Sequence, residues 1–91
     1  MTQPTEREIR DFLLRHFSAT LQTRNVKLEE IDENFDFLKS GVIDSLGVIE
    51  MIGAVESHFR IVLDFETMDP EDLTILGKFC GFVAEHAQPA A

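Results

Sequence analysis

The sequence has 91 residues, of which 44% are hydrophobic and 27% are charged. It is long enough for one hydrophobic core and too short for a second, so we expect a single domain. The 17 acidic and 8 basic residues give a formal net charge of -9. This charge argues against binding to nucleic acid or to anionic membranes, because both require a basic surface.

The polar N-terminus and the single cysteine bear on where the protein resides. Residues 1–8 contain no apolar run of signal-peptide length, and no stretch approaches the roughly 18 apolar residues of a membrane span. Cys80 has no second cysteine with which to form a disulfide or a metal site. We therefore expect a cytoplasmic protein in a reducing compartment, without membrane insertion.

The first helix is predicted to begin after Thr5. Thr5 and Glu8 form a capping box, in which each side chain binds the backbone amide of the other. Apolar and aromatic side chains then recur every three or four residues, which places on one face Ile9, Phe12, Leu13, His16, Phe17 and Leu21.

From residue 22 to residue 43 no helical period persists, although apolar side chains remain frequent. A structureless loop of this length is unusual in a compact domain. We expect these residues, called the strap below, to be pinned to the core by their apolar side chains and to contain a short helical turn.

Asp44 is a good N-cap for a second helix over residues 45–58, with a buried face formed by Val48, Ile52, Val55 and Phe59. Residues 59–65 are the only part of the chain that resembles a β-strand. Thr74 is predicted to cap the last helix, in which Gly77 and Gly81 would allow another backbone to approach closely.

These elements predict an all-α fold. We expect a small four-helix bundle of three main helices and one short helix before the last, with a long first loop. The domain spans residues 1–91, and residues 1–4 and 87–91 are expected to fray.

Enzyme and metal signatures are absent from the sequence. A nucleophile elbow around Ser45 would need glycine where Ile43 stands, and a calcium loop starting at Asp32 would need glycine where Phe37 stands. Cys80 lies in an apolar stripe, so we expect a buried hydrophobic residue. The three histidines fall on different elements and are interpreted as packing or solvated residues: His16, His58 and His86. The sequence therefore predicts a non-catalytic protein without a metal site.

Acidic residues are concentrated in the second half of the chain. Residues 1–43 hold eight acidic and six basic residues, whereas residues 44–91 hold nine acidic and two basic residues. A surface of one sign favours recognition by basic patches on partner proteins, and it also serves simple solubility.

The segment Phe37-Leu38-Lys39-Ser40-Gly41-Val42-Ile43-Asp44-Ser45-Leu46 opens an acidic amphipathic helix in the middle of a short acidic chain. This combination resembles the acyl carrier protein family and its helical bundle. In that family the serine of Asp-Ser-Leu carries 4'-phosphopantetheine, donated by coenzyme A, as a phosphodiester. The resemblance implies that Ser45 is the attachment site, and that Asp44 is a helix cap able to contact a metal ion during modification.

The resemblance also implies a set of partners. In the family, the helix after the serine and the following turn are recognised by enzymes, and the matching candidates here are Leu46, Gly47, Glu50, Glu56, Asp64, Glu66 and residues 69–72. Glu56 also falls within the buried arc, where a local ion pair is the alternative. The implied partners are a phosphopantetheinyl transferase, an acyl- or aminoacyl-adenylating ligase, and a downstream acyltransferase or synthase. We expect a monomer.

Gly47 bears on the cargo. Fatty-acid carriers usually have an acidic residue at this place, whereas Ser45-Leu46-Gly47 looks more like the Ser-Met-Gly of D-alanyl carrier proteins. We therefore favour a discrete carrier of an amino acid or another small acid, held as a thioester, over a carrier of a growing fatty acid. The alternative is an unmodified acidic helical adaptor that binds a basic protein, in which Ser45 only begins a helix.

Overall fold

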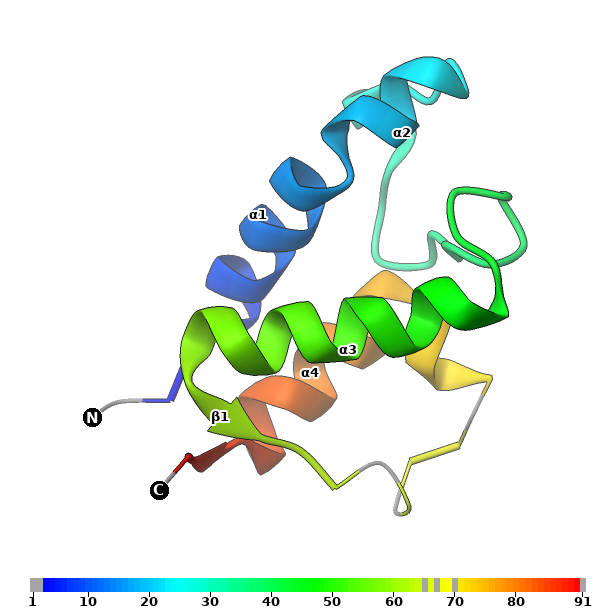
Figure 1. Ribbon diagram of the computed structural model, residues 1–91. Coiled ribbons are helices and arrows are strands. Elements are labelled where there is room, and N and C mark those ends of the chain that lie inside the picture. The colour runs from blue at the N-terminus through cyan, green and yellow to red at the C-terminus, as the bar shows by residue number, and fades with distance from the viewer. Residues whose placement is uncertain (1–2, 65, 67, 70, 91) are drawn as a thin grey trace.

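The structure, a computed structural model, describes residues 3–64, 66, 68–69 and 71–90. Within these residues the chain forms four α-helices: α1 (Glu6–His16), α2 (Ser18–Thr23), α3 (Ser45–Phe59) and α4 (Leu76–His86). The 3-10 turns η1 (Leu28–Glu30) and η3 (Asp72–Thr74) lie in the connections, and β1 (Ile61–Val62) pairs with β2 (Gln88–Pro89) (Figure 1). The predicted small helical bundle with a long first loop is confirmed.

The capping box starts α1 as predicted. The Glu8 amide donates to Thr5 Oγ at 3.1 Å, and the Thr5 amide donates to Glu8 Oε1 at 3.0 Å. The sequence predicts one continuous helix to Leu21, and this is wrong, because the helix is interrupted at Phe17. The break turns the chain so that Leu21 is buried while the Phe17 ring packs against Phe37, with centroids 5.4 Å apart.

The end of α3 leads into the ribbon that joins the two ends of the chain. Arg60 adopts the left-handed conformation, with φ 55°, and ends the helix one residue later than predicted. Its carbonyl accepts a hydrogen bond from the Ala90 amide at 3.0 Å. The strand character expected in residues 59–65 is confirmed by β1.

The described residues that were expected to fray, 3–4 and 87–90, are instead held by burial or by hydrogen bonds. Ala87 is buried, the Gln3 side chain donates to the Ala87 carbonyl, and β2 pairs with β1. Pro4 is also buried. The hydrogen bond from Gln3 to Ala87 thus joins the first and last described parts of the chain. The expectation for residues 1, 2 and 91 lies outside the described residues.

The start of α4 differs from the prediction. Thr74 belongs to η3 and does not cap the helix, which begins after Ile75. The strap supplies the missing partners, because the Leu76 amide donates to the Phe35 carbonyl and the Gly77 amide to the Glu33 carbonyl, at 2.9 and 2.8 Å. Within the described residues, η3 stands where the short helix before the last was expected.

The two glycines of α4 have different neighbours. A Cβ atom on Gly77 would lie 2.9 Å from the Glu33 carbonyl oxygen, so the predicted close backbone approach is confirmed there. At Gly81 the nearest neighbour is the Glu6 carboxylate, at 3.0 Å, which is a side chain and not a backbone.

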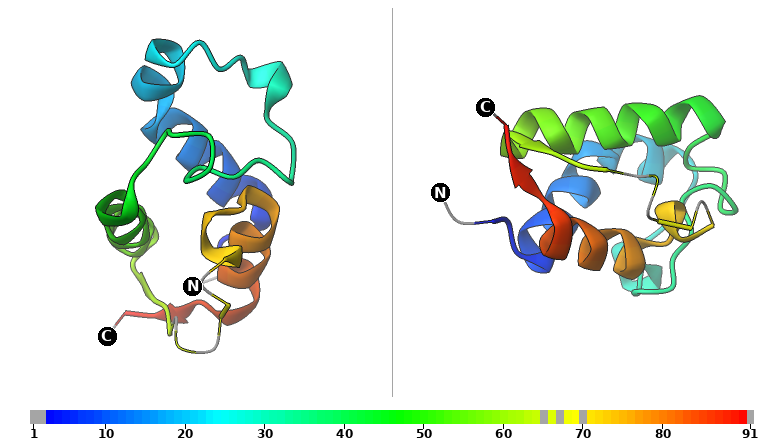
Figure 2. Two further views of the ribbon diagram at one scale, coloured as in Figure 1. Left: turned by 90° about the vertical axis from the view of Figure 1, so that its right-hand side faces the viewer. Right: turned by 90° about the horizontal axis from the view of Figure 1, so that it is seen from below.

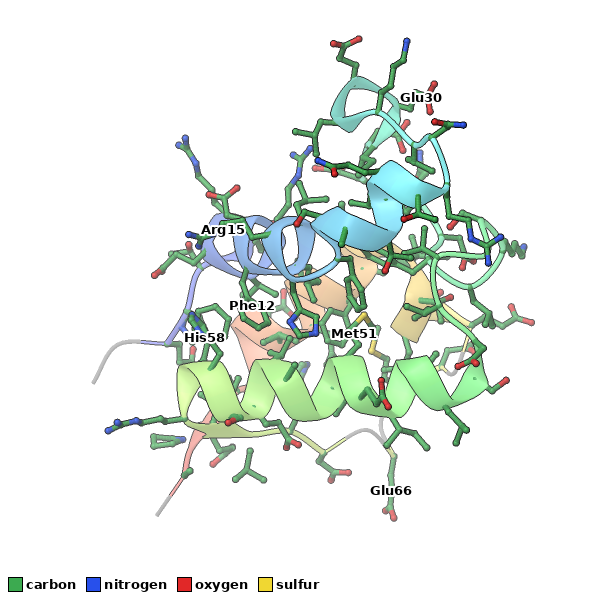
Figure 3. All side chains as sticks on the ribbon, turned by 45° about the horizontal axis from the view of Figure 1, so that its top comes forward. Phe12, Arg15, Glu30, Met51, His58 and Glu66 are labelled. Atoms are coloured by element: carbon green, nitrogen blue, oxygen red, sulfur yellow. The ribbon has the colours of Figure 1, made fainter. Side chains whose placement is uncertain are left out.

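The core lies where α1, α3, α4 and the strap meet. α1 packs most closely against α4, and α3 lies across them (Figure 1 and Figure 2). The largest fully buried side chains come from all four segments: Phe37, Phe79, Ile9, Leu13, Met51, Leu76, Val55 and Val83. Between α1 and α3, the Phe12 ring stacks on the imidazole of His58, with centroids 4.3 Å apart (Figure 3). The strap is thus as much a part of the core as the helices are.

Candidate functional site

Ser45 is the first residue of α3, and its side chain is exposed. The helix start is capped by its neighbour, because Asp44 Oδ1 accepts a hydrogen bond from the Gly47 amide at 2.7 Å. Among the described residues, the Ser45 hydroxyl has no hydrogen-bond partner. It is therefore available to an enzyme without loss of the cap.

A tight loop in the strap delivers the chain to Ser45. The Phe37 side chain is buried, and its carbonyl accepts from the Ile43 amide at 3.1 Å and from Ser40 Oγ at 3.1 Å. Gly41 turns the chain with φ +81°, a conformation that side chains rarely adopt. Val42 and Ile43 are buried directly before the cap. Packing on both sides of the loop thus fixes the place where α3 begins.

The structure explains why residue 47 is a glycine, which the sequence alone does not. A Cβ atom at this position would lie 2.8 Å from Ile43 Cβ, closer than real side chains approach one another. The last strap residue before the cap therefore packs against the first turn of α3 at a place where that turn has no side chain.

Two exposed apolar side chains accompany Ser45 on α3. Leu46 is 71% exposed and Ile49 is 66% exposed, and residues three apart are neighbours on a helix surface. The exposed Glu50 lies beside them. Exposed large apolar side chains of this kind are characteristic of surfaces that bind partners.

Sequence reasoning missed Ile49, because it centred the buried face of the helix on Val48 and Ile52. The fully buried residues are Met51 and Val55. Ile49 lies about 200° from Met51 around the helix, so it faces solvent. The signal was present in the apolar arc, which is wider than one buried face requires.

The other predicted recognition residues do not gather at Ser45. Glu56 is half-buried, and its Oε2 accepts from the Leu63 amide at 2.9 Å, so its local role is a hydrogen bond to backbone and not the ion pair considered above. Asp64 Oδ1 accepts from the Glu66 amide at 3.1 Å. Figure 3 shows Glu66 projecting on the side of α3 that faces away from α1.

Some of the carboxylates at residues 69–72 are engaged in local contacts. Asp72 Oδ1 lies 3.1 Å from Lys78 Nζ. Asp69 Oδ1 accepts from the Glu71 amide at 3.0 Å. Residue 70 lies outside the described residues.

Other reactive groups are occupied in packing. Burial, with a smaller contribution from Glu6, raises the pKa of the Cys80 thiol to about 12, as expected of a buried hydrophobic residue. The described residues contain no group of three or more His, Cys, Asp or Glu side chains placed to hold a metal ion. None of the described helices is long and apolar enough to cross a membrane.

Asp36, in the strap, is a carboxylate to which the sequence gives a role in a turn, after the calcium loop that it would have shared with Asp32 is excluded. Its Oδ1 accepts from the Leu38 and Lys39 amides at 2.9 and 3.0 Å. Partial burial acts to raise its pKa. The Lys39 and Leu38 amides bind the charged form, and together with the nearby Thr74 hydroxyl and the Lys39 charge they outweigh burial, so the pKa of Asp36 lies below its ordinary value.

This shift predicts a pH-dependent contribution to stability. A carboxyl group whose pKa is lowered by folding stabilises the protein above its unfolded pKa, and the contribution is lost as the pH falls through the folded pKa. The difference in free energy of unfolding between wild type and Asp36→Asn should be constant near neutrality and shrink below about pH 4. Urea unfolding of both proteins across this range measures it. A difference that stays constant in acid would contradict the prediction.

Comparison with known proteins agrees with this geometry. A D-alanyl carrier protein of Streptococcus suis is 33% identical to the chain over 60 residues, which are 64% of this chain and 76% of that protein. The chain belongs to the carrier-protein family. No family model and no solved structure match this carrier protein. The resemblance drawn from the Asp-Ser-Leu segment is therefore confirmed at the level of the family.

Proposed function

We propose that this carrier protein holds an acyl or aminoacyl group as a thioester on a 4'-phosphopantetheine arm attached to Ser45, and delivers it between partner enzymes. The observation that carries the proposal is the exposed Ser45 hydroxyl, free of hydrogen bonds within the described residues, at the start of a helix capped by another side chain. The protein itself supplies no catalytic group, because the reactive atom is the thiol that the arm supplies when attached.

The start of α3 fits a phosphodiester. Because Asp44 already caps the Gly47 amide, the amides of Ser45 and Leu46 remain unpaired within the described residues. Unpaired amides and the positive end of the helix dipole favour a bound phosphate group. Asp44 is exposed beside the serine, where a metal ion held by the transferase could contact its second oxygen.

The exposed surface of α3 is the proposed recognition site for the partners. Leu46 and Ile49 offer apolar contacts, and Glu50 offers a charge to a basic patch on a transferase, a ligase or a downstream acyltransferase. Asp64 and Glu66 extend the acidic surface beyond the helix. Glu56 contributes indirectly, by holding the backbone after β1.

For the cargo we propose an amino acid or another small acid. Gly47 alone no longer supports this choice, because the Ile43 side chain explains it. The support comes from the relative in Streptococcus suis, whose name states that it carries D-alanyl groups. We further propose a monomeric cytoplasmic protein of one domain over residues 1–91, in agreement with its acidic surface and its buried, unpaired thiol.

Intact-mass measurement tests the attachment site. Wild-type protein is incubated with coenzyme A, magnesium and a broad-specificity phosphopantetheinyl transferase, beside Ser45→Ala and the control Ser57→Ala, which changes an exposed serine on the same helix. Wild type and Ser57→Ala should gain one phosphopantetheine, and Ser45→Ala none. Because the Ser45 hydroxyl makes no hydrogen bond in the described structure, its loss should change the free energy of unfolding by no more than about 0.5 kcal/mol.

Two outcomes would contradict the proposal. A folded wild-type protein that gains no mass with this transferase, or with one encoded beside it, would favour the acidic adaptor. A mass gain that persists in Ser45→Ala would move the attachment to another residue.

A further inference from the structure

The strap is fastened to the start of α4 by backbone hydrogen bonds. Three amides donate across this junction, Phe37 to Thr74, Leu76 to Phe35 and Gly77 to Glu33, with distances of 2.9, 2.9 and 2.8 Å. Asp36 and Ile75 form an isolated antiparallel bridge in the middle of the set. A short stretch of the strap thus behaves as an extra strand laid along residues 74–77.

Asp36 turns the chain directly after this junction. Its side-chain oxygen binds the Leu38 and Lys39 amides, and its carbonyl accepts from the Ser40 amide at 3.0 Å. An aspartate that binds the amides two and three residues ahead holds a turn closed in the same way as a helix cap. One side chain therefore closes the turn that follows the junction and sets the direction of the loop.

A backbone hydrogen bond within the loop links this turn to the modification site. The Phe37 carbonyl accepts from the Ile43 amide, so the loop is closed across its base. The next two residues are the cap Asp44 and the serine itself. The path from Asp36 to Ser45 therefore runs through the hydrogen bonds of the loop and not through a direct bond between the two side chains.

We propose that Asp36 is a positioning residue for the modification of Ser45: its side chain closes the turn between the junction with α4 and the loop before Ser45, and this latch holds the first turn of α3 in the form that a transferase binds. This inference rests on the proposed function. A transferase that met an unlatched strap would have to order it on binding, and ordering a segment weakens binding without changing the reacting atoms. Loss of the latch should therefore raise KM for the carrier protein and leave kcat nearly unchanged.

Steady-state transfer from coenzyme A, measured against carrier concentration, tests the latch. Asp36→Ala should raise KM about tenfold and leave kcat within about twofold. Asp36→Asn keeps an oxygen at the position that binds the two amides, and it should restore KM to near the wild-type value. The matched control is Asp32→Ala. It removes a similar turn earlier in the strap, in which the Asn34 amide donates to Asp32 Oδ1 at 2.9 Å.

Two kinetic results would contradict the inference. Equal KM values for Asp36→Ala and wild type would overturn the inference, and so would an Asp32→Ala variant as impaired as Asp36→Ala. Circular dichroism at the assay temperature confirms that each variant is folded, so that a lower concentration of folded carrier cannot imitate a raised KM.

Hydrogen exchange on the wild-type protein gives a second test that does not depend on the variants folding. The latch predicts that the Leu38, Lys39 and Ile43 amides exchange through the same opening as those of Leu76 and Gly77, with one shared dependence on denaturant. Separate openings for the loop and for the start of α4 would overturn it. If wild type is never modified, the proposed function fails and the positioning role with it, and the exchange result then decides only whether the loop and the start of α4 open together.

Discussion

Phe37→Ala is expected to lower the free energy of unfolding by about 3–5 kcal/mol. Phe37 is 1% exposed, and its ring packs against those of Phe17 and Phe35, with centroids 5.4 and 5.2 Å apart. Removal of a buried ring costs its transfer free energy and leaves a cavity that rigid neighbours cannot fill. A domain of this size has a total stability of about 5–15 kcal/mol, so the loss is a large part of the whole.

Urea unfolding followed by circular dichroism measures this loss, with Phe35→Ala as the control. Phe35 belongs to the same aromatic cluster but is only half-buried, so its removal should cost clearly less. A loss at Phe37 no larger than that at Phe35 would show that the Phe37 ring is no more a part of the core than the half-buried Phe35 ring.

The starts of two helices could be predicted from the sequence because their signals are local. A capping box needs only Thr5 and Glu8, and the cap of α3 needs only Asp44 and the amide of Gly47. Thr74 gives the same local signal, yet the strap occupies the amides that it would have capped. The prediction failed there because the partner lies about forty residues away in the sequence.

The break at Phe17 and the pairing of β2 with β1 also depend on distant contacts. The apolar period continues through Phe17, and only the position of the Phe37 ring shows why the chain bends there. A strand of two residues, such as Gln88–Pro89, has no period that a sequence could display. Such elements form because a segment distant in the sequence packs against them or pairs with them.

In the candidate site, too, some residues could be predicted from the sequence and others could not. Ser45 and Asp44 could be found from a motif of three residues in its context. The roles of Gly47 and Asp36 could not, because each depends on where the strap lies against a helix. Asp36 resembles any other turn residue in the sequence, and its junction with α4 appears only in the folded chain.

Gly77→Ala is expected to destabilise the protein by about 1–3 kcal/mol, although alanine is the better helix former. The added Cβ would lie 2.8 Å from Glu33 Cβ and 2.9 Å from the Glu33 carbonyl oxygen. The strap would have to move away, and the hydrogen bond from the Gly77 amide to that carbonyl, 2.8 Å long, would be lost or stretched. Thermal or urea unfolding measures the change.

Gly53→Ala is the matched control, since Gly53 is also inside a helix but a Cβ atom there would meet nothing within 4 Å. It should stabilise the protein by about 0.5–1 kcal/mol through helix propensity alone. The two glycines therefore predict changes of opposite sign from the same substitution. If Gly77→Ala were as stabilising as Gly53→Ala, the strap would not be seated on the start of α4, and the latch at Asp36 would lose the junction on which it depends.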